Sequence, residues 1–221
     1  MKAPSRSHKI IARVMRAFFY LLYQPLAWSY DWVAALVSWG RWQDWVMSVL
    51  PYLEGPRVLE TGHGPGHLQV ALNQKGIATF GTDASRQMSR QARKRLTKHA
   101  IEPKLARGMA QKLPFPAANF DQVVATFPSE YISAPETLAE IYRTLKPGGT
   151  LVVLPAAQIT GKRLSDRGTA ALFRVTGQAS EWDQRWLEPF SRAGFEPRVE
   201  MITHKSWSVV IILAEKSIQN L

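Results

Sequence analysis

One glycine-rich segment of this chain has the spacing of a nucleotide-binding loop. Residues Glu60–Gly66 carry an acid followed by glycines at three alternate positions, at the end of a run of apolar residues. Glycine permits tight turns and close approach of the backbone to a ligand, and a helix starting near Pro65 would point free N–H groups at the same place. The dinucleotide pattern G-x-G-x-x-G requires glycine where this chain has His67, so a nicotinamide cofactor is disfavoured.

A second acid stands where the ribose of a nucleoside would be held. Asp83 ends the run Phe80–Asp83, which predicts the second strand of a βαβ unit, so its side chain is expected beside the glycine segment. An ionised carboxylate there can accept hydrogen bonds from both ribose hydroxyls. The glycine segment, Asp83 and the βαβ context together favour a nucleoside-containing cofactor.

Few side chains of this chain could move a proton or bind a metal. Glu130, Tyr131 and His63 are the candidate catalytic residues, because the end of the fourth predicted strand and the glycine segment face the same place. The pattern favours a role in the pocket wall for each of them over a role as a base. The chain has no cysteine, which excludes disulfides, thiolate metal sites and a cysteine nucleophile. His67 and His204 have no companions at ligand spacing, so no metal site is expected.

Strand-like and helix-like patterns alternate along the part of the chain that must position these residues. The predicted strands are Arg57–Glu60, Ile77–Phe80, Pro103–Ala106, Phe120–Thr126 and Thr150–Leu154, and the predicted helices are Leu68–Lys75, Ser85–Lys98 and Pro135–Lys146. This alternation indicates an α/β, Rossmann-like, doubly wound and mostly parallel sheet. Two further runs, Phe195–Ile202 and Ser206–Ala214, are too close for a helical crossover, so they predict an antiparallel C-terminal hairpin and seven strands in all.

Helical patterns also lie outside the sheet. Residues 5–23 and 29–49 predict two N-terminal helices separated at Pro25, and residues 156–193 predict a further helical region that is a candidate substrate cap. The length of 221 residues suits one globular domain. We therefore expect an N-terminal helical extension or lid over residues 1–50 and a ligand-binding domain over residues 51–221.

Several ordered motifs resemble those of class I S-adenosylmethionine-dependent methyltransferases. They cover roughly residues 56–215 and comprise Val58–Leu68, Gly81–Ser85, Gly108–Phe115, Phe120–Val124 and Leu145–Gly149. The resemblance implies that S-adenosyl-L-methionine is the cofactor and S-adenosyl-L-homocysteine the product. It also implies transfer of the methyl group from a sulfonium to an oxygen, nitrogen or carbon atom of an acceptor.

The same resemblance implies a set of cofactor-binding residues. The glycine segment would embrace the methionine part of the cofactor, with Glu60 near its amino group and Asp83 on the ribose. Where the family usually has an acid that contacts the adenine, this chain has Met109, whose side chain offers only dispersion and sulfur contacts. The hydrogen bonds to the adenine would then come from the backbone N–H groups of Met109 and Ala110. The full expected set is Tyr30, Glu60, Gly62, His63, Gly64, Gly66, Asp83, Ala84, Met88, Met109, Ala110, Thr126 and Phe127.

The segment Ala27–Asp31, with Ser38–Trp42 behind it, resembles the entry segment of ubiquinone/menaquinone C-methyltransferases of methyltransferase type 11 and their small-molecule relatives. In those enzymes the Tyr-Asp region helps to close the cofactor pocket. Residues 126–131 differ from their characteristic residues after the fourth strand, so a quinone is a candidate acceptor and not an established one.

Tryptophans repeat along one side of the second predicted helix. They are Trp28, Trp32, Trp39 and Trp42. A core stripe packed on the sheet would explain this pattern, and so would an aromatic wall for a flat, apolar acceptor. The two explanations are compatible if they apply to different rings.

The formal net charge of +11 arises in two segments. Residues 1–24 hold five basic residues and no acid, and residues 86–112 hold nine basic residues and one acid. The helix over residues 5–23 has a basic face that could rest on an anionic membrane surface or be solvated. A nucleic-acid partner is disfavoured, because no aromatic residue that could stack on a base occurs between Ser85 and Lys112.

No run approaches the roughly 20 apolar residues that a spanning helix needs. We therefore expect a cytoplasmic protein that is either free or peripheral on the inner face of the membrane. The expected function is methyl transfer from S-adenosylmethionine to a small, apolar or lipidic acceptor, such as a quinone-like molecule or a lipid. The alternatives are an RNA or protein methyltransferase that uses the basic surface, and a non-catalytic cofactor-binding protein. The oligomeric state is open.

Overall fold

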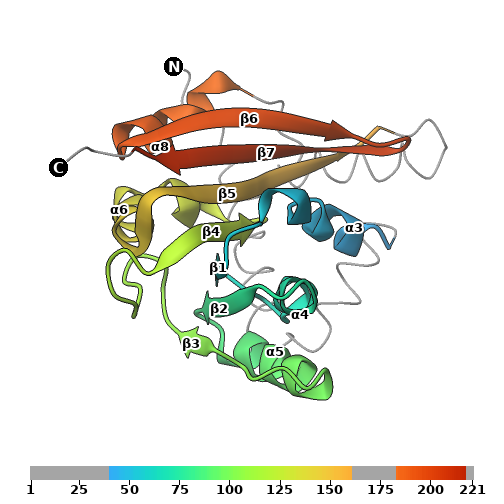
Figure 1. Cartoon of the computed structure of the whole chain (residues 1–221). Helices are drawn as coiled ribbons and strands as arrows, with labels where there is room; N and C mark the ends of the chain where they lie inside the picture. Colours follow the sequence, from blue (N-terminus) through green and yellow to red (C-terminus); the bar gives the residue numbers. More distant parts are fainter. Residues whose placement is uncertain (1–39, 161–182, 218–221) are drawn as a thin grey trace, which may run out of the picture.

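Seven strands form one sheet in the computed structural model, which describes residues 40–160 and 183–217. The strands are β1 (Arg57–Thr61), β2 (Ala78–Asp83), β3 (Leu105–Arg107), β4 (Phe120–Thr126), β5 (Leu145–Ile159), β6 (Phe195–Thr203) and β7 (Trp207–Lys216). Their order is β3-β2-β1-β4-β5-β7-β6 (Figure 1). β1 to β5 pair in parallel, and β7 pairs antiparallel with both β5 and β6. The predicted mostly parallel sheet with an antiparallel C-terminal hairpin is confirmed.

Helices cover both faces of this sheet, as a doubly wound fold requires. The α-helices are α3 (Trp42–Met47), α4 (His67–Gln74), α5 (Arg86–Lys98), α6 (Pro135–Thr144) and α8 (Glu188–Arg192), and the short 3-10 helices are η2 (Leu50–Tyr52), η3 (Glu130–Ser133) and η4 (Gln184–Leu187). In Figure 1, α3, α4 and α5 lie on one side of the strands, and α6 and α8 lie on the other.

Two apolar clusters fill the space between the helices and the sheet. Neighbouring residues of one strand enter different clusters, because successive side chains of a strand point to opposite faces. In β4, Val124 packs with Trp45 and Leu68 beneath α3 and α4, whereas Val123 packs with Ile141 beneath α6. All five of these side chains are almost fully buried. The sheet is thus a rigid support for whatever binds at its edge.

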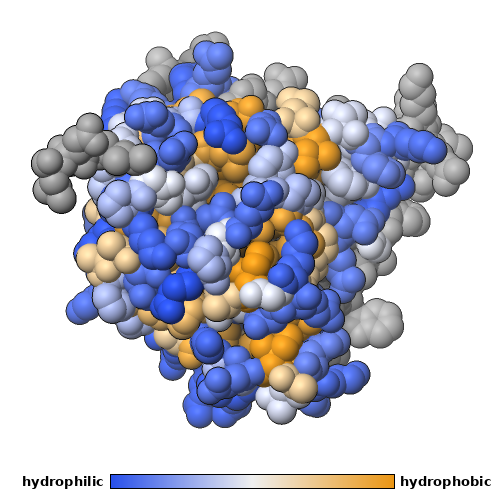
Figure 2. Space-filling model, in the orientation of Figure 1, coloured by the Kyte–Doolittle hydropathy of each residue, from blue (hydrophilic) through white to orange (hydrophobic). Residues whose placement is uncertain are grey.

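The outer surface mixes charged and apolar residues. On the face in Figure 2, hydrophilic residues dominate and apolar groups show between them. Met109 and Met201 are the large apolar side chains most exposed among the described residues, at 61% and 60%. Within residues 40–160 and 183–217, no helix combines the length and apolar character that crossing a bilayer requires.

Some element boundaries differ from those that the sequence predicts. Helix was predicted from residue 156 onward, but β5 continues to Ile159 and pairs with β7 as far as Trp207. The register of this pair shifts between Val153 and Ala156, so a bulge accommodates Pro155, which cannot donate to the ladder.

Other predicted boundaries are wrong by a few residues. The predicted helix over residues 29–49 breaks at Met47, and η2 follows it. α4 begins at His67, two residues beyond Pro65, because Gly66 adopts a left-handed conformation at its N-terminus. Helix is confirmed at Glu188–Arg192, at the end of the candidate cap. The predicted helix over residues 5–23, the first part of the second predicted helix and the middle of the candidate cap lie outside the described residues.

The strand order identifies the edge of the sheet where a ligand would bind. β1 lies between β2 and β4, so the chain runs outward from β1 in one direction through β2 and β3 and in the other direction through β4 and β5. Ligands of open α/β sheets bind at this reversal, beyond the carboxyl ends of the strands. Here those ends are Thr61 of β1 and Thr126 of β4.

Candidate functional site

Backbone geometry fixes the glycine loop that leads from β1 to α4. The Gly62 N–H donates to the Thr82 carbonyl of β2 at 2.7 Å. The φ angles of Gly62, Gly64 and Gly66 are +70°, +52° and +85°, in the left-handed region that disfavours a side chain. A Cβ on Gly66 would lie 2.9 Å from the Cβ of Ala92 in α5, whereas a Cβ on Gly64 would meet nothing within 4 Å. The loop is therefore packed tightly at Gly66 and open to a ligand at Gly64.

Two backbone N–H groups hold the carboxylate of Asp83 beside this loop. Its Oδ2 accepts from the Gly64 N–H at 2.9 Å, and its Oδ1 accepts from the Ser85 N–H at 2.7 Å. A carboxylate has about four acceptor positions, so two remain for other donors. Asp83 is thus oriented by the protein and still able to accept from the two hydroxyls of a ribose. The predicted proximity of Asp83 to the glycine loop is confirmed.

Glu60 is a buried acid beneath the loop. Its side chain is 2% exposed, and its Oε2 accepts from Nε2 of Gln69 in α4 at 2.8 Å. Burial, and to a smaller extent the negative charge of Asp83, raise the pKa of Glu60 to about 8 against the opposing effect of the Gln69 hydrogen bond. Glu60 is therefore largely protonated at neutral pH. A cation placed in the site would stabilise its ionised form.

His63 occupies a niche that glycine leaves in β2. A Cβ on Gly81 would lie 2.9 Å from Cδ2 of His63, so the imidazole fits only because that position has no side chain. The ring Nδ1 lies 2.8 Å from the Gly64 carbonyl, which can only accept, so Nδ1 carries the proton. Burial lowers the pKa of His63 against the opposing effect of Asp83, which favours the neutral ring.

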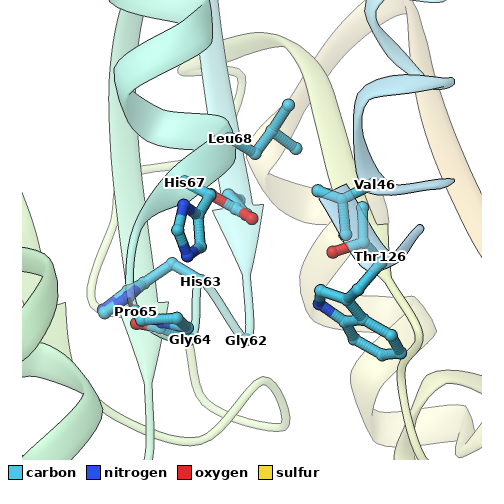
Figure 3. Close-up of a pocket in the computed structure, with 10 residues that line it drawn as sticks. Val46, Gly62, His63, Gly64, Pro65, His67, Leu68 and Thr126 are labelled. Atoms are coloured by element: carbon cyan, nitrogen blue, oxygen red, sulfur yellow. Dashed lines mark hydrogen bonds between the residues drawn. The ribbon is translucent and has the colours of Figure 1, made fainter. Parts of the chain in front are cut away.

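The remaining ring nitrogen of His63, Nε2, is buried and has no hydrogen-bond partner among the described residues. In Figure 3 the His63 side chain extends away from Val46 and Thr126, on the far side of the loop. This orientation favours His63 as a packing residue over His63 as a general base for a substrate between α3 and β4.

A cavity lies between the glycine loop on one side and α3 with the end of β4 on the other (Figure 3). Its lining residues are Trp42, Val46, Glu60, Gly62, His63, Gly64, Pro65, His67, Leu68 and Thr126. The two walls also contact each other, since Nε2 of Gln43 in α3 lies 3.3 Å from Nδ1 of His67 in α4. α3 thus covers the edge of the sheet where a ligand would bind.

Half of the cavity lining consists of predicted site residues, and the other half was not in the predicted set. Pro65, His67 and Leu68 belong to the glycine motif itself, so the motif carried the signal. Trp42 was named in the tryptophan stripe and as the end of the segment Ser38–Trp42, but not as a cofactor-binding or catalytic residue. No sequence signal indicated Val46, because its position depends on how α3 folds back over the sheet.

Of the remaining candidate bases, Tyr131 contacts the loop and Glu130 does not line the cavity. The Tyr131 hydroxyl donates to the Thr61 carbonyl at 3.3 Å and would lie 3.0 Å from a Cβ on Gly62. Glu130 begins η3 with an exposed side chain. Of the three candidate bases, Tyr131 is therefore the one whose side chain contacts the backbone of the loop from another element. Glu130 is exposed, and Nε2 of His63 is turned away from the cavity (Figure 3).

The residues predicted to surround the adenine and ribose lie on the β2–β3 side of the loop. Met109 is 61% exposed after β3, and Ala110 beside it is 9% exposed. Ala84 is exposed at the start of the β2–α5 connection, and its carbonyl accepts from Arg107. Met88 is 1% exposed inside α5, so its side chain does not line the cavity. Tyr30 lies outside the described residues.

Across residues 40–160 and 183–217, no three His, Asp or Glu side chains are grouped closely enough to hold a metal ion. The groups that line the cavity are loop backbone, the carboxyl group of Glu60, two imidazole rings, the hydroxyl of Thr126 and apolar side chains. Such a set fits an organic molecule with hydroxyl and amino groups.

Comparison with known families gives a match over the strands and loops just described. Residues 58–149 match a family model described as "Methyltransferase domain". The matched range begins in β1, includes the glycine loop and Asp83, and ends in the first residues of β5.

Curated proteins with similar sequences include quinone methyltransferases. The chain is 33% identical over 149 residues to a demethylmenaquinone methyltransferase of Symbiobacterium thermophilum, covering 62% of this chain and 58% of that protein. It is 31% identical over 145 residues to the ubiquinone/menaquinone biosynthesis C-methyltransferase UbiE of Cupriavidus taiwanensis, covering 62% of this chain and 60% of that protein. The chain thus spans less than two thirds of the length of these relatives.

Solved structures share the fold at low sequence identity. Geranyl diphosphate methyltransferase in complex with SAM superposes with a TM-score of 0.58 at 15% identity, covering 79% of this chain and 84% of that one. Phosphoethanolamine N-methyltransferase 2 of Haemonchus contortus, in complex with phosphomonomethylethanolamine and S-adenosylhomocysteine, gives 0.58 at 18% identity, covering 80% of this chain and 53% of that one.

Proposed function

We propose that the chain is a class I S-adenosylmethionine-dependent methyltransferase, which transfers a methyl group from this cofactor to a small, apolar or lipidic acceptor such as a quinone-like molecule or a lipid. The single observation that carries the proposal is the pairing of the open loop at Gly64 with the oriented carboxylate of Asp83. The apolar acceptor is supported by the similarity to quinone methyltransferases and by the apolar wall of α3.

Each part of the cofactor has a plausible partner in this arrangement. Asp83 would accept from the ribose hydroxyls through the acceptor positions that the backbone leaves open. Glu60 would face the methionine ammonium, whose positive charge would draw the proton from the buried carboxyl. The backbone at Gly62 and Gly64 would lie along the methionine chain. Met109 and Ala110 would border the adenine.

The main contribution of the protein to this reaction would be to orient the reacting groups. S-adenosylmethionine supplies an activated methyl group on its sulfonium when bound. The chain's part is to align the acceptor atom with that methyl and to exclude water, which can remove several kcal/mol of barrier. Val46, Leu68 and Thr126 would exclude water from the cavity. Tyr131 is the side chain best placed near the loop to hold or move a proton of the acceptor.

A titration with S-adenosylhomocysteine tests the cofactor part of this proposal. We expect Asp83→Ala and Asp83→Asn to weaken binding at least about tenfold by calorimetry, because both remove a charged acceptor of hydroxyl hydrogen bonds. Asp183→Ala is the matched control, since Asp183 pairs with Arg185 on the surface before η4. Unchanged affinity in both Asp83 variants would refute the ribose assignment, and no binding by the wild type would refute the cofactor itself.

The second candidate function is methyl transfer to RNA or protein, and the exposed basic face of α5 is the observation that favours it. Five exposed cations stand on this helix, and it contains no acid: Arg86, Arg90, Arg93, Lys94 and Lys98. Labelled methyl groups found in RNA or protein, and not in small molecules, would favour that candidate.

The N-terminal segment is the basis of a proposal on domain organisation and location. We propose a lid over residues 1–50 and a cytoplasmic protein that contacts anionic membrane surfaces through residues 5–23. Flotation with anionic liposomes tests this contact, with glutamine at Arg6, Lys9, Arg13 and Arg16 as the comparison. Equal partitioning of the two chains would remove the membrane contact from the proposal.

A further inference from the structure

The connection between β3 and β4, residues 108–119, contains neither a helix nor a strand. Its buried backbone groups therefore need hydrogen-bond partners from outside regular structure. Pro114 and Pro116 have no N–H group and cannot donate to neighbouring carbonyls. Two side chains of α6, Glu140 and Arg143, bind the backbone of this connection instead.

The Glu140–Arg143 pair contacts the backbone on both sides of Pro114. Oε2 of Glu140 accepts from the Leu113 N–H at 2.7 Å. Nη2 of Arg143 donates to the Leu113 carbonyl at 3.1 Å, and Nη1 donates to the Phe115 carbonyl at 2.8 Å. The guanidinium also donates to both oxygens of Glu140, through Nε at 2.7 Å and Nη2 at 2.8 Å. The two side chains are thus oriented by each other and by the connection.

The charges of this pair strengthen its contacts with the backbone. The hydrogen bond from Arg143 lowers the pKa of Glu140, partial burial opposes this change, and the Leu113 N–H lowers the pKa further. Arg143 and Glu140 are 38% and 22% exposed, so the ion pair by itself would stabilise the fold little. Hydrogen bonds from charged groups to backbone are stronger, and their removal leaves backbone groups unsatisfied.

Apolar contacts anchor the same stretch of the connection to the sheet. Leu113 is 4% exposed and belongs to the apolar cluster beneath α6. The ring of Phe115 packs edge-on against Phe80 and Phe120, with centroid distances of 6.2 Å and 5.1 Å. The side chains of the stretch therefore hold it on the sheet, while the Glu140–Arg143 pair holds its backbone.

The stretch just before this anchor contains the residues that would border the adenine. The Lys112 N–H donates to the Met109 carbonyl at 3.1 Å and closes a turn, and the Gly108 N–H donates to the Asp83 carbonyl at 3.2 Å. Met109 and Ala110 thus lie between a contact with the proposed ribose acid and the anchored stretch. Among the residues that the structure describes, neither of their N–H groups donates to another protein group. Both N–H groups therefore remain available to a ligand.

We propose that Glu140 and Arg143 are positioning residues, which fix the N–H groups of Met109 and Ala110 against the cofactor and so select adenine over other bases. The inference rests on the proposed function and adds two residues that do not line the cavity. They would act through the backbone that they hold. A fixed N–H favours a base with a lone pair facing it and disfavours a base with a donor there, because two donors would be left unpaired.

Calorimetry with two ligands that differ only in the base tests this role. The full chain is titrated with S-adenosylhomocysteine and with S-inosylhomocysteine, whose hypoxanthine has an N–H at N1 where adenine has a lone pair. We expect the wild type to prefer S-adenosylhomocysteine by at least about tenfold. Arg143→Leu should reduce this preference to less than about threefold, because the connection loses its donor and the N–H groups are no longer fixed. Arg192→Leu is the matched control, since Arg192 pairs with Glu188 on the exposed surface of α8.

Exchanging the two residues separates positioning of the connection from ion pairing within α6. The double variant with Glu140→Arg and Arg143→Glu keeps two opposite charges at the same spacing, but it places donors against the Leu113 N–H and acceptors against the carbonyls. We expect this variant to lose the preference for adenine as Arg143→Leu does. Arg143→Lys keeps the charge without the planar fork and should retain part of the preference, and it replaces the other variants if they do not fold.

Three results would overturn the inference. The first is equal binding of the two ligands by the wild type. The second is that Arg143→Leu weakens both ligands equally or changes only the free energy of unfolding in urea, which would leave the pair a purely structural role. The third is a wild-type preference in the exchanged variant, because ion pairing would then be enough. A wild type that does not bind S-adenosylhomocysteine would instead refute the proposed function, so the two failures are distinguishable.

Discussion

Replacing Glu60 by glutamine is expected to stabilise the protein at neutral pH and to remove the loss of stability that the Glu60 carboxyl causes between pH 4.5 and about 8. The native Glu60 carboxyl has a pKa of about 8, against an ordinary value of 4.5, mainly because it is buried. Between these two values the native state keeps a proton that the unfolded chain has released. The contribution of Glu60 to stability is therefore fully present below pH 4.5 and is lost as the pH rises toward 8.

The size of the effect follows from the two pKa values. Each pKa unit corresponds to about 1.4 kcal/mol, so keeping Glu60 protonated at pH 7 costs the native state about 3 kcal/mol relative to the ionised unfolded chain. Glutamine is neutral in both states and can still accept from Gln69 through its amide oxygen. Glu60→Gln should therefore raise the free energy of unfolding at pH 7 by up to about 3 kcal/mol.

Urea unfolding at several pH values between 5 and 8 measures this difference. The free energy of unfolding of the wild type should fall relative to that of Glu60→Gln as the pH rises. Glu102→Gln is the control, because Glu102 is an exposed glutamate. Parallel curves for wild type and Glu60→Gln would contradict the burial of a protonated carboxyl. The same variant should bind S-adenosylmethionine more weakly, which separates stability from function.

Two further predictions concern contacts that hold the site in place. Gly66→Ala should lower the free energy of unfolding by about 2 kcal/mol more than Gly76→Ala in thermal or urea unfolding, because both have positive φ but only Gly66 would bring a Cβ within 2.9 Å of Ala92; equal losses would contradict the tight packing of α5. Tyr52→Phe should cost about 1–2 kcal/mol, because the hydroxyl donates to the Glu200 carboxylate at 2.6 Å and so joins η2 to β6; no loss would show that this hydrogen bond does not stabilise the fold.

Local patterns were enough to predict the sheet and the position of the loop. Phe120–Thr126 was predicted as a strand and is β4 with those bounds. β1, β2 and β4 each contain a short apolar run and are followed by a helix with a 3.6-residue period, and the crossover rule then brings Asp83 next to the glycine loop. These features are determined by residues that are close together in the sequence, so the sequence pattern is enough to predict them.

Contacts between distant segments were not predictable in the same way. Pro155 suggests the end of β5, yet a bulge against β7 lets the strand continue. The niche for His63 exists because Gly81 is on the adjacent strand. The stacking of Trp42 on Phe127 depends on the place where α3 returns to the sheet. Each of these depends on two segments that only the fold brings together.

The central claim is methyl transfer to a small, apolar acceptor, and one measurement tests it most directly. The full chain is incubated with S-adenosylmethionine carrying an isotopically labelled methyl group and with a lipid and quinone extract, RNA and protein in parallel, and products are detected by mass spectrometry. We expect label in a small, apolar or lipidic molecule, and its loss when Asp83 is replaced by alanine. Label only in RNA or protein, or no transfer by a chain that binds the cofactor, would contradict the account.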